Sequence, residues 1–380
     1  MIALRVIRPS RSVREYVKQF AGAGVLNTRI HRHDQMLLFE GREGKQKRDS
    51  AVRTYFQIGS DIAHSIRQLV KWKFGGFQNI NKFLDFASGY GRVTRFLVQH
   101  IEPSRLWVSD ILAEAVKFQK ANLGVQGFVS VSDPNQLEIA ERFDCILACS
   151  LFTHLPESTF VKWLEKLYGL LAPNGLLIIS THDEFLLKVP PCNGPLFRFE
   201  RVSEIETLDK EEYGSTTVNE HYVRAAIQQA TRGTGSYFRI PRGLNRYQDF
   251  YLITAQPPPD FAALPGSLGP QGCVDSISLV GPELLEVAGW AFDPGRSNVE
   301  VRVVVQGELI QKCRPGEYRD DVARYFENPN AEHSGFRCVG QLPGKANSLH
   351  SASLGVFAIG SSGESFSMFN GRLGEALGKK

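Results

Sequence analysis

The chain has 380 residues, which is long enough for two or three domains that each bury a hydrophobic core. Its 44 basic and 40 acidic residues leave a net charge of +4, which is too balanced for a protein that binds nucleic acid through a concentrated basic surface. No apolar run has the length of a membrane-spanning helix, and no apolar segment of a signal peptide follows Met1 to Arg5. A cytoplasmic protein without nucleic-acid partners is therefore expected.

The cysteines show no pattern that binds metal or forms a disulfide framework. Six cysteines occur without any Cys-x-x-Cys pair, so the sequence predicts neither kind of site. Cys145 and Cys149 fall on a predicted core strand, and free cysteine is usually buried. The composition, with 22% charged and 42% hydrophobic residues, is that of an ordinary soluble globular protein.

The first 60 residues predict a helical and loop segment. Gly41–Asp49 is a charged, glycine-containing stretch, which is typical of a solvated loop. From Ala51 to Trp72, apolar residues recur at the three- and four-residue intervals of an amphipathic helix. Two of them, Tyr55 and Phe56, are aromatic and are expected to pack in the core.

A strand, a glycine-containing loop and a helix start are predicted next. The apolar pair Phe83-Leu84 leads to the carboxylate of Asp85, and Gly89 and Gly91 precede the amphipathic run Val93–Val98. Glycines are needed where φ is positive or where a side chain would collide with a ligand. The helix start offers free backbone N–H groups. By itself this pattern fits a plain turn as well as a ligand-binding loop.

A second apolar run that ends in an acid follows at Leu106–Asp110. Asp110 lies about 20 residues beyond the glycine loop, the spacing at which nucleotide-binding α/β folds place the carboxylate that holds ribose hydroxyls. The run Ile111–Val116 continues with helical periodicity, so Asp110 is also a candidate helix cap. One carboxylate can serve in both roles.

Strands and helices then alternate, which predicts a parallel sheet covered by helices on both faces. Gly127–Val131 is the best candidate for the third strand. Asp133 after it is either a polar residue near a ligand or the start of a turn before Pro134. Cys145–Ala148 is continuously apolar, as expected for a strand buried on both faces, and its carboxyl end lies where open α/β sheets bind ligands.

The next helix is predicted to begin near Ser158, and the fifth strand covers Leu176–Ser180. The segment 181–235 is long and contains many loop residues, with a helix expected around 219–230. Long connections of this kind usually carry function. Ser236–Ile240 and Asp249–Thr254 have the pattern of two closing antiparallel strands. The acceptor of any reaction would be recognised mainly by the long segment.

The pattern changes after a proline- and glycine-rich linker at residues 256–270. Val299–Val305 alternates in the manner of a half-buried strand and turns at Gln306-Gly307. Short strands separated by Gly and Pro continue to residue 380, so residues 271–380 predict a small β-sandwich. Trp290 is either a platform for a sugar or a core residue, and the core role is the more common one.

Four of these stretches together resemble the motifs of class I S-adenosylmethionine-dependent methyltransferases. Phe83–Arg92 resembles the first motif, Asp110 the ribose-binding acid, Phe143–Leu155 the fourth strand with its extension, and Leu171–Ser180 the turn into the fifth strand. The resemblance implies a methyltransferase domain at residues 61–255. Its fold would be α/β, with a Rossmann-like seven-stranded sheet and helices on both faces.

The resemblance implies S-adenosylmethionine as the cofactor and no metal. It assigns the cofactor-binding residues as Asp85, Ala87, Ser88, Gly89, Gly91, Asp110, Ile111, Asp133, Cys149 and Ser150. The family usually has Gly-Cys-Gly or similar where this chain has Ala87-Ser88-Gly89, and these small side chains should still let the backbone approach the methionine moiety. The C-terminal half resembles an accessory module of bacterial glycan-related enzymes at Gly289–Pro294, Arg319–Val322 and Gly335-Phe336.

The implied activity is methylation of a small molecule or a glycan- or sugar-derived acceptor, with O-methylation favoured. His154 is a candidate general base, because a hydroxyl must lose its proton as it attacks; its alternative is a structural role at the helix start. His182 and Asp183 compete for the task from the same sheet edge. A non-catalytic cofactor- or carbohydrate-binding protein is the alternative function. A nicotinamide dehydrogenase is disfavoured, because position 94 is threonine rather than a further glycine. The oligomeric state is not indicated.

Overall fold

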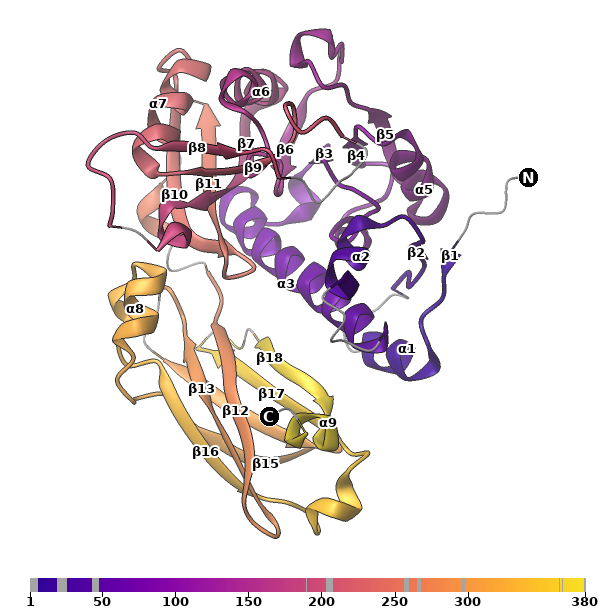
Figure 1. Cartoon of the computed structure of the whole chain (residues 1–380), viewed down its shortest axis with the longest axis vertical. Coiled ribbons are helices and arrows are strands. Elements are labelled where there is room, and N and C mark those ends of the chain that lie inside the picture. The colour runs from indigo at the N-terminus through magenta and orange to yellow at the C-terminus, as the bar shows by residue number, and fades with distance from the viewer. Residues whose placement is uncertain are drawn as a thin grey trace. The chain divides into compact units, whose positions relative to one another are not determined.

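The structure is a computed structural model, and it describes residues 6–18, 26–42, 48–188, 190–202, 208–255, 260–264, 268–295, 298–361, 363 and 365–378. The chain divides into two compact units, residues 1–259 and 260–380, whose elements are labelled in Figure 1. Within the described ranges, no helix is long and apolar enough to cross a membrane.

The first unit contains a nine-stranded sheet. Seven strands follow the order β10-β11-β7-β6-β3-β4-β5, and β9 and β8 extend the sheet beside β7. The pairs within β7-β6-β3-β4-β5 are parallel, whereas β10 and β11 close the sheet as antiparallel strands. The strands are β3 (Phe83–Phe86), β4 (Leu106–Asp110), β5 (Gln126–Val129), β6 (Phe143–Ala148), β7 (Leu171–Asp183), β8 (Phe197–Glu200), β9 (Ser215–Val218), β10 (Gly235–Leu244) and β11 (Gln248–Ala255). The predicted mixed α/β fold with a parallel-dominated sheet is confirmed.

Helices pack against this sheet. They are α3 (Arg48–Phe74), α4 (Thr94–Leu97), α5 (Ala113–Leu123), α6 (Glu157–Gly169) and α7 (Glu220–Ala230). Helices α6 and α7 contact each other, and their buried faces form one hydrophobic core with β3, β6, β7 and β11. Helix α3 lies apart from that pair in Figure 1 and contacts α4 and β10. The helices predicted from apolar periodicity before the glycine loop and after the fourth strand are therefore present.

The N-terminal segment belongs to the same compact unit. Strand β1 (Val6–Ile7) pairs with β2 (Ile30–His31), and both α1 (Arg11–Lys18) and α2 (Gln35–Arg42) contact α3. Residues 43–47 of the predicted charged loop lie outside the described residues.

Arg95 in α4 ties this segment to the glycine loop. Its side chain is 1% exposed. Its guanidinium donates to the carbonyls of Asn27 at 3.2 Å, Arg29 at 2.8 Å and Gly91 at 2.8 Å, and to the hydroxyl of Tyr55 at 3.1 Å. A buried guanidinium needs acceptors for its five donors. The N-terminal segment therefore supports the shape of the glycine loop, although the two are distant in sequence.

The second unit consists of two antiparallel sheets, of order β12-β13-β16 and β15-β14-β17-β18. The valines at 299, 301, 303 and 305 are buried, as the alternation predicts. They share one core with buried side chains of β13, β16 and β17. The strands are β12 (Gln271–Gly281), β13 (Leu284–Phe292), β14 (Val299–Val305), β15 (Glu308–Cys313), β16 (Gly335–Gln341), β17 (Ser353–Gly360) and β18 (Ser365–Arg372), with α8 (Asp320–Phe326) and α9 (Leu373–Leu377) beside them.

Trp290 is a core residue of this unit. It is 9% exposed, and its ring lies 5.9 Å from that of Phe292 and 5.2 Å from that of Phe326 in α8. This burial leaves little of the ring open to a sugar. The structural role considered for this tryptophan is the one that the packing supports.

A disulfide joins Cys313 to Cys338, although the spacing of the cysteines suggests no disulfide framework. The two Cα atoms are 6.0 Å apart, and the residues are separated by 25 positions in sequence. Spacing alone could not indicate this pair, because Cys313 ends β15 and Cys338 lies in β16 of the other sheet. Disulfides persist mainly in oxidising compartments, which argues against the expected cytoplasmic location.

Candidate functional site

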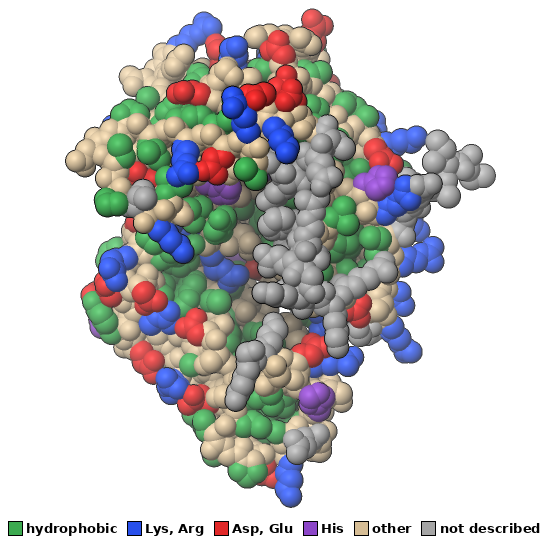
Figure 2. All heavy atoms as spheres, viewed as in Figure 1, with side chains coloured by type: hydrophobic (Ala, Val, Ile, Leu, Met, Phe, Trp, Pro, Cys, Tyr) green, Lys and Arg blue, Asp and Glu red, His purple; other side chains and the backbone are tan. Residues whose placement is uncertain are grey.

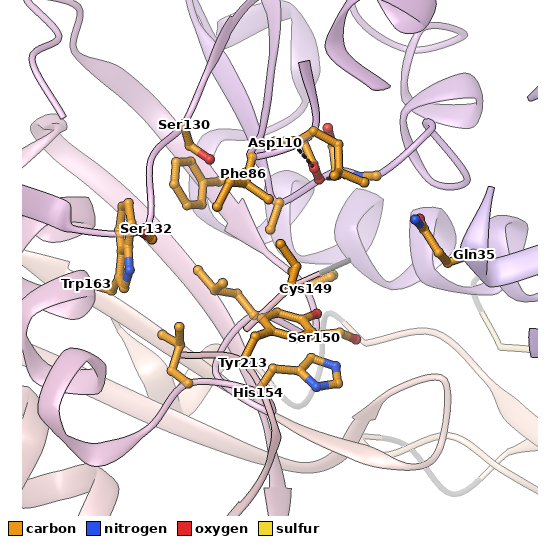
Figure 3. A pocket seen from close by; sticks show the side chains of 18 of the residues that line it. Gln35, Phe86, Asp110, Ser130, Ser132, Cys149, Ser150, His154, Trp163 and Tyr213 are labelled. Carbon is orange, nitrogen blue, oxygen red and sulfur yellow. Dashed lines mark hydrogen bonds between the residues drawn. The ribbon is translucent and has the colours of Figure 1, made fainter. Parts of the chain in front are cut away.

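A cavity of about 360 Å³ lies at the carboxyl ends of β3, β4 and β6, where open α/β sheets bind ligands. Figure 3 shows side chains from these strand ends, from α2 and α6, and from the segment before β9 arranged around it. Gly91 and His182 are not among the residues that line it. The other sequence-predicted residues do line it: Asp85, Ala87, Ser88, Gly89, Asp110, Ile111, Asp133, Cys149, Ser150 and His154.

The loop after β3 has backbone conformations that favour glycine. Gly89 has φ 55° and Gly91 has φ 81°, and Ala87 shares this left-handed region with φ 57°. A Cβ on Gly91 would lie 2.8 Å from Oε1 of Gln119, whereas a Cβ on Gly89 would meet no atom within 4 Å. Gly91 is therefore needed for packing, and Gly89 borders open space that a ligand can occupy.

Asp110 links the glycine loop to the helix that follows β4. Its Oδ2 accepts the N–H of Gly89 at 2.8 Å, and its Oδ1 accepts the N–H of Leu112 at 2.9 Å. Burial raises the pKa of Asp110, and these two donors oppose the rise. A carboxylate has about four accepting positions, so Asp110 can support the helix start and still accept from two hydroxyl groups.

Asp85 is buried beside Thr94, whose Oγ1 donates to Oδ2 of Asp85 at 2.7 Å. Burial raises the pKa of Asp85 to about 7; the Thr94 hydrogen bond opposes this rise and the negative charge of Asp110 adds to it. A carboxyl group with this pKa is readily ionised by a nearby cation. The environment of Asp85 therefore suits a ligand that carries an ammonium group.

Asp133 both begins a turn and lines the cavity. Its Oδ1 accepts the N–H of Asn135 at 3.0 Å. Its neighbours Ser130 and Ser132 also line the cavity, as Figure 3 shows. The two roles weighed for Asp133 from the sequence are thus compatible in space.

Strand β6 delivers Cys149 and Ser150 to the cavity. Ser150 has φ 55°, and its N–H donates to Oγ of Ser180 at 2.8 Å. Its Oγ lies 3.0 Å from Nε2 of Gln248, which donates to it. These contacts hold the turn after β6 against β7 and β11. Burial raises the pKa of Cys149 well above its ordinary value, which keeps its thiol neutral and unreactive.

His154 is held in one tautomer at the cavity wall. Its Nδ1 lies 2.7 Å from the carbonyl oxygen of Gly214, which can only accept, so Nδ1 carries the proton and Nε2 keeps an accepting lone pair. The ring stacks on Tyr213 with centroids 4.4 Å apart. A Cβ on Gly214 would lie 2.6 Å from the ring of Phe199, so this contact requires glycine. Burial lowers the pKa of His154 to about 4, and the ring is neutral at pH 7.

His182 lies behind this wall, in β7 opposite Thr217 of β9. Its ring contacts the edge of Tyr247 at 5.6 Å. Burial is the main cause of the lowered pKa of His154, the hydrogen bond to Gly214 opposes it, and the charge of His182 lowers the pKa further. Asp183 beside it is bound to Arg239 at 3.2 Å. These positions suit an indirect role for both residues.

The cavity wall also includes Asp34, Gln35 and Arg92, which the sequence pattern does not single out. Asp34 accepts the N–H of Met36 at 3.1 Å and the hydroxyl of Tyr55 at 2.6 Å. Burial raises the pKa of Asp34. The local signal in the sequence is an aspartate directly before a helix, which is typical of an N-cap and says nothing of a cavity.

Among the described residues, His31, His33 and Glu114 have candidate metal-ligand atoms that lie within 4.8 Å of one another. His31 Nδ1 accepts the N–H of His33 at 3.2 Å, so the ring proton is on Nε2, which faces Oε1 of Glu114 at 3.5 Å. A metal ion at Nε2 would have to displace that proton and leave an imidazolate anion. The geometry therefore favours a histidine–carboxylate contact over a metal site.

Residues 84–177 match the family model of the methyltransferase domain. The matched residues include the glycine loop, Asp110, β6 and His154, so the match covers most of the cavity. No curated protein matches the chain.

Several solved methyltransferases are similar to the chain at low identity. An S-adenosylmethionine-dependent methyltransferase from Clostridium acetobutylicum ATCC 824 is 16% identical with a TM-score of 0.37, over 51% of this chain and 91% of that chain. The N-methyltransferase NodS from Bradyrhizobium japonicum WM9, solved with S-adenosyl-L-homocysteine, is 13% identical with a TM-score of 0.37, over 59% and 100%. The glycopeptide N-methyltransferase MtfA is 14% identical with a TM-score of 0.34, over 47% and 82%. At these TM-scores the likeness carries no argument about the acceptor.

The cavity residues fit the cofactor of the matched family. Gly89 borders open space, Asp110 has accepting positions left for ribose hydroxyls, and Asp85 can face an ammonium group. Residues 84–177 therefore match a methyltransferase domain, and the cavity that they largely line is suited to S-adenosylmethionine as a cofactor.

Proposed function

We propose that this enzyme methylates a hydroxyl group of a small-molecule, glycan or sugar-derived acceptor. The proposal depends on His154, whose Nδ1–H is held by the carbonyl of Gly214 at 2.7 Å while Nε2 remains an acceptor. A hydroxyl must lose its proton as its oxygen attacks. A positioned base contributes about 10²–10⁴-fold to such a step.

His154 Nε2 takes the proton of the acceptor hydroxyl and later returns it to solvent. S-adenosylmethionine supplies an electrophilic methyl group when bound. The overall change is a methyl ether on the acceptor, the demethylated cofactor and one released proton. Most of the rate enhancement comes from holding the reacting groups together in a cavity that excludes water.

The roles of the cofactor-binding residues are part of the same proposal. Asp110 would hold the ribose, Asp85 would support the amino-acid portion, and the backbone at Gly89 would approach the cofactor closely, while Gly91 would maintain the shape of the loop. The remaining wall would be formed by Ala87, Ser88, Ile111, Asp133, Cys149 and Ser150. His182 would tune His154 from outside the cavity.

The domain plan is part of the same proposal. A helical and loop segment at 1–60 precedes a methyltransferase domain at 61–255, and a linker at 256–270 leads to a β-sandwich accessory domain at 271–380. The boundary between the compact units, after residue 259, falls within that linker, and buried side chains from both sheets of the second unit form one core. The accessory domain would hold a glycan or a protein partner.

A non-catalytic binding protein is the second candidate. Burial lowers the pKa of His154 to about 4, and a base becomes less effective as its pKa falls below the working pH. A chain that binds the cofactor without turnover would fit this observation.

Turnover distinguishes the two candidates. The full-length protein is supplied with S-adenosylmethionine and with nucleotide sugars or glycan fragments, and formation of S-adenosylhomocysteine is measured. Acceptor-dependent product supports the enzyme. Tight cofactor binding without product from hydroxyl, amine or carboxylate acceptors supports the binding protein, and preferential binding of NAD by calorimetry overturns both.

A further inference from the structure

Arg92 is a cation on the cavity wall that has no partner in the described part of the chain. It follows Gly91, and its half-buried side chain forms no hydrogen bond or ion pair with a described residue. Arg95, three positions later, has its guanidinium satisfied by several carbonyls. A guanidinium carries five donors, and withdrawing them from bulk water without acceptors is unfavourable.

Close packing confines the stem of Arg92. A Cβ on Gly59 of α3 would lie 3.2 Å from Cγ of Arg92 and 2.7 Å from the ring of Phe96. Glycine inside a helix lowers its stability. At position 59 it is required because any larger residue would prevent α3 from packing closely against Arg92 and Phe96. The Arg92 side chain is thereby held between α3 and the cavity.

The electrostatic effects of Arg92 indicate where its charge acts. Burial raises the pKa of both Asp34 and Cys149, and the positive charge of Arg92 is among the effects that oppose the rise at each. Asp34 precedes α2 and Cys149 follows β6, so the guanidinium is within reach of both walls. Gln35 points from α2 toward the same space in Figure 3, and its amide also has no partner among the described residues.

We infer that Arg92 and Gln35 form a receptor for a carboxylate inside the cavity. The guanidinium fork matches a carboxylate through two parallel hydrogen bonds, and the Gln35 amide can donate another. Asp34 is not that carboxylate, because it is held by Tyr55 and Met36 and forms no ion pair with Arg92. The inference rests on the proposal that the cavity holds both the cofactor and its acceptor.

Two molecules can supply such a carboxylate. The cofactor carries an α-carboxylate on its methionine portion, and an acidic acceptor such as a uronic acid carries one of its own. Either molecule would present the same planar carboxylate group to Arg92. The experiment therefore needs one arm for each source.

The first arm measures binding of S-adenosylhomocysteine and of its decarboxylated analogue by calorimetry. If the cofactor is the source, Arg92→Met weakens S-adenosylhomocysteine about 10- to 100-fold, the range for lost charged hydrogen bonds. The analogue should bind the wild-type and variant proteins equally, because it lacks the group that Arg92 contacts. Gln35→Leu should show the same selectivity with a smaller change.

The second arm titrates glucuronate and glucose into protein saturated with S-adenosylhomocysteine. If the acceptor is the source, wild-type protein binds glucuronate more tightly than glucose, and Arg92→Met removes the difference while cofactor affinity is unchanged. Arg232→Met, at an exposed residue paired with Glu165, removes the same charge elsewhere and should alter neither arm.

Equal losses for S-adenosylhomocysteine and its analogue would mean that Arg92 acts on cavity shape, and the receptor would be disproved. Unchanged binding in both arms would disprove it as well. These outcomes leave cofactor binding by the wild-type protein intact, so they are distinct from failure of the proposed function. That failure would appear as absent turnover.

Discussion

The two compact units differ in where their buried charged groups and strained backbone residues lie. In the first unit, burial raises the pKa values of Asp34, Asp85 and Asp110 around one cavity. Ala87 and Ser150 in the same wall have left-handed φ angles, which are strained for residues with a Cβ. Buried carboxylates and left-handed φ angles both lower the stability of the fold, so packing alone does not explain why they occur around the cavity.

The second unit places most of its charged side chains and its strained residues at the surface; Asp293, which is 2% exposed, is an exception. Its main core is built of apolar side chains and Cys338. Arg337 pairs with Glu286 at 2.7 Å on the exposed side, and acidic and basic side chains of this unit lie interspersed on the face drawn in Figure 2. Its left-handed non-glycine residues, Gln306 and Glu327, lie at a turn and at a helix end. The cavity of the first unit combines strained residues with buried carboxylates. Elsewhere in that unit the buried Arg242, with φ 55°, pairs with Asp249, so neither feature by itself marks a ligand site.

The largest effect should come from removing the proposed base. His154→Gln should lower turnover about 10²–10⁴-fold with little change in cofactor affinity. His333→Gln alters an exposed histidine of the second unit and should leave turnover unchanged. Steady-state rates and calorimetry measure the two quantities. Equal turnover in both variants would return His154 to a structural role.

The pH dependence sharpens the same test. Because burial lowers the pKa of His154 to about 4, the ring stays neutral from pH 7 down to that value. The wild-type rate should therefore show no loss from His154 near pH 6.5 and should decline as pH approaches 4. Between pH 6.5 and 4 the unfolded chain binds the extra proton at this residue, so its contribution to stability falls as the pH is lowered. Because Asp85 has a pKa of about 7, only a decline near pH 6.5 that disappears in His154→Gln would contradict the buried environment of His154.

The second unit should respond to loss of its disulfide. Replacing Cys313 and Cys338 by alanine should lower its free energy of unfolding by about 3 kcal/mol, as expected for a loop of this length. Denaturant unfolding with and without reductant checks this, with Cys192→Ala at an exposed free cysteine as the control. Cofactor affinity should not change. Identical unfolding of reduced and oxidised protein would show that the bridge does not stabilise this unit.

A smaller effect is expected at Asp110. Asp110→Ala should weaken cofactor binding by about 1.5–3 kcal/mol, because hydrogen bonds to a charged group are lost. Asp144→Ala is a matched control, since Asp144 also accepts two backbone N–H groups, from Asn81 and Lys82, but does not line the cavity. Calorimetry with S-adenosylhomocysteine should separate them. Equal affinity in the two variants would limit Asp110 to supporting the start of α5.

The sequence predicted the elements that local pattern determines. Buried strands β3 and β6, the glycine loop and the acid at 110 each depend on neighbouring residues. So does the helix predicted from 51 to 72, which the structure extends to 48 and 74. A strand that is apolar on both faces can be recognised without knowing its partners. These elements meet at the carboxyl edge because parallel strands end on one side.

Contacts between distant segments could not be predicted. Arg95 has the pattern of an exposed helical residue, yet it is buried because carbonyls at 27 and 29 accept from it. Arg92 and Gln35 meet the cavity only through the packing of α2 and α3 against the loop. The bond between Cys313 and Cys338 depends on two sheets facing each other. In each case the deciding partner lies far away in sequence, so no local spacing reports it.

The smallest expected effect tests the strain itself. Ala87 has φ 57°, which costs about 1–2 kcal/mol for a residue with a Cβ, and glycine avoids this cost while losing about 0.5–1 kcal/mol through greater freedom of the unfolded chain. Ala87→Gly should therefore stabilise the first unit by about 0.5–1 kcal/mol. Ala288→Gly in β13 relieves no such strain and should destabilise the second unit by a similar amount. The glycine loop would also be less rigid before binding, so cofactor affinity should fall slightly even as stability rises. Denaturant unfolding and calorimetry give both values, and a loss of stability in Ala87→Gly would show that backbone strain is not what separates the two units.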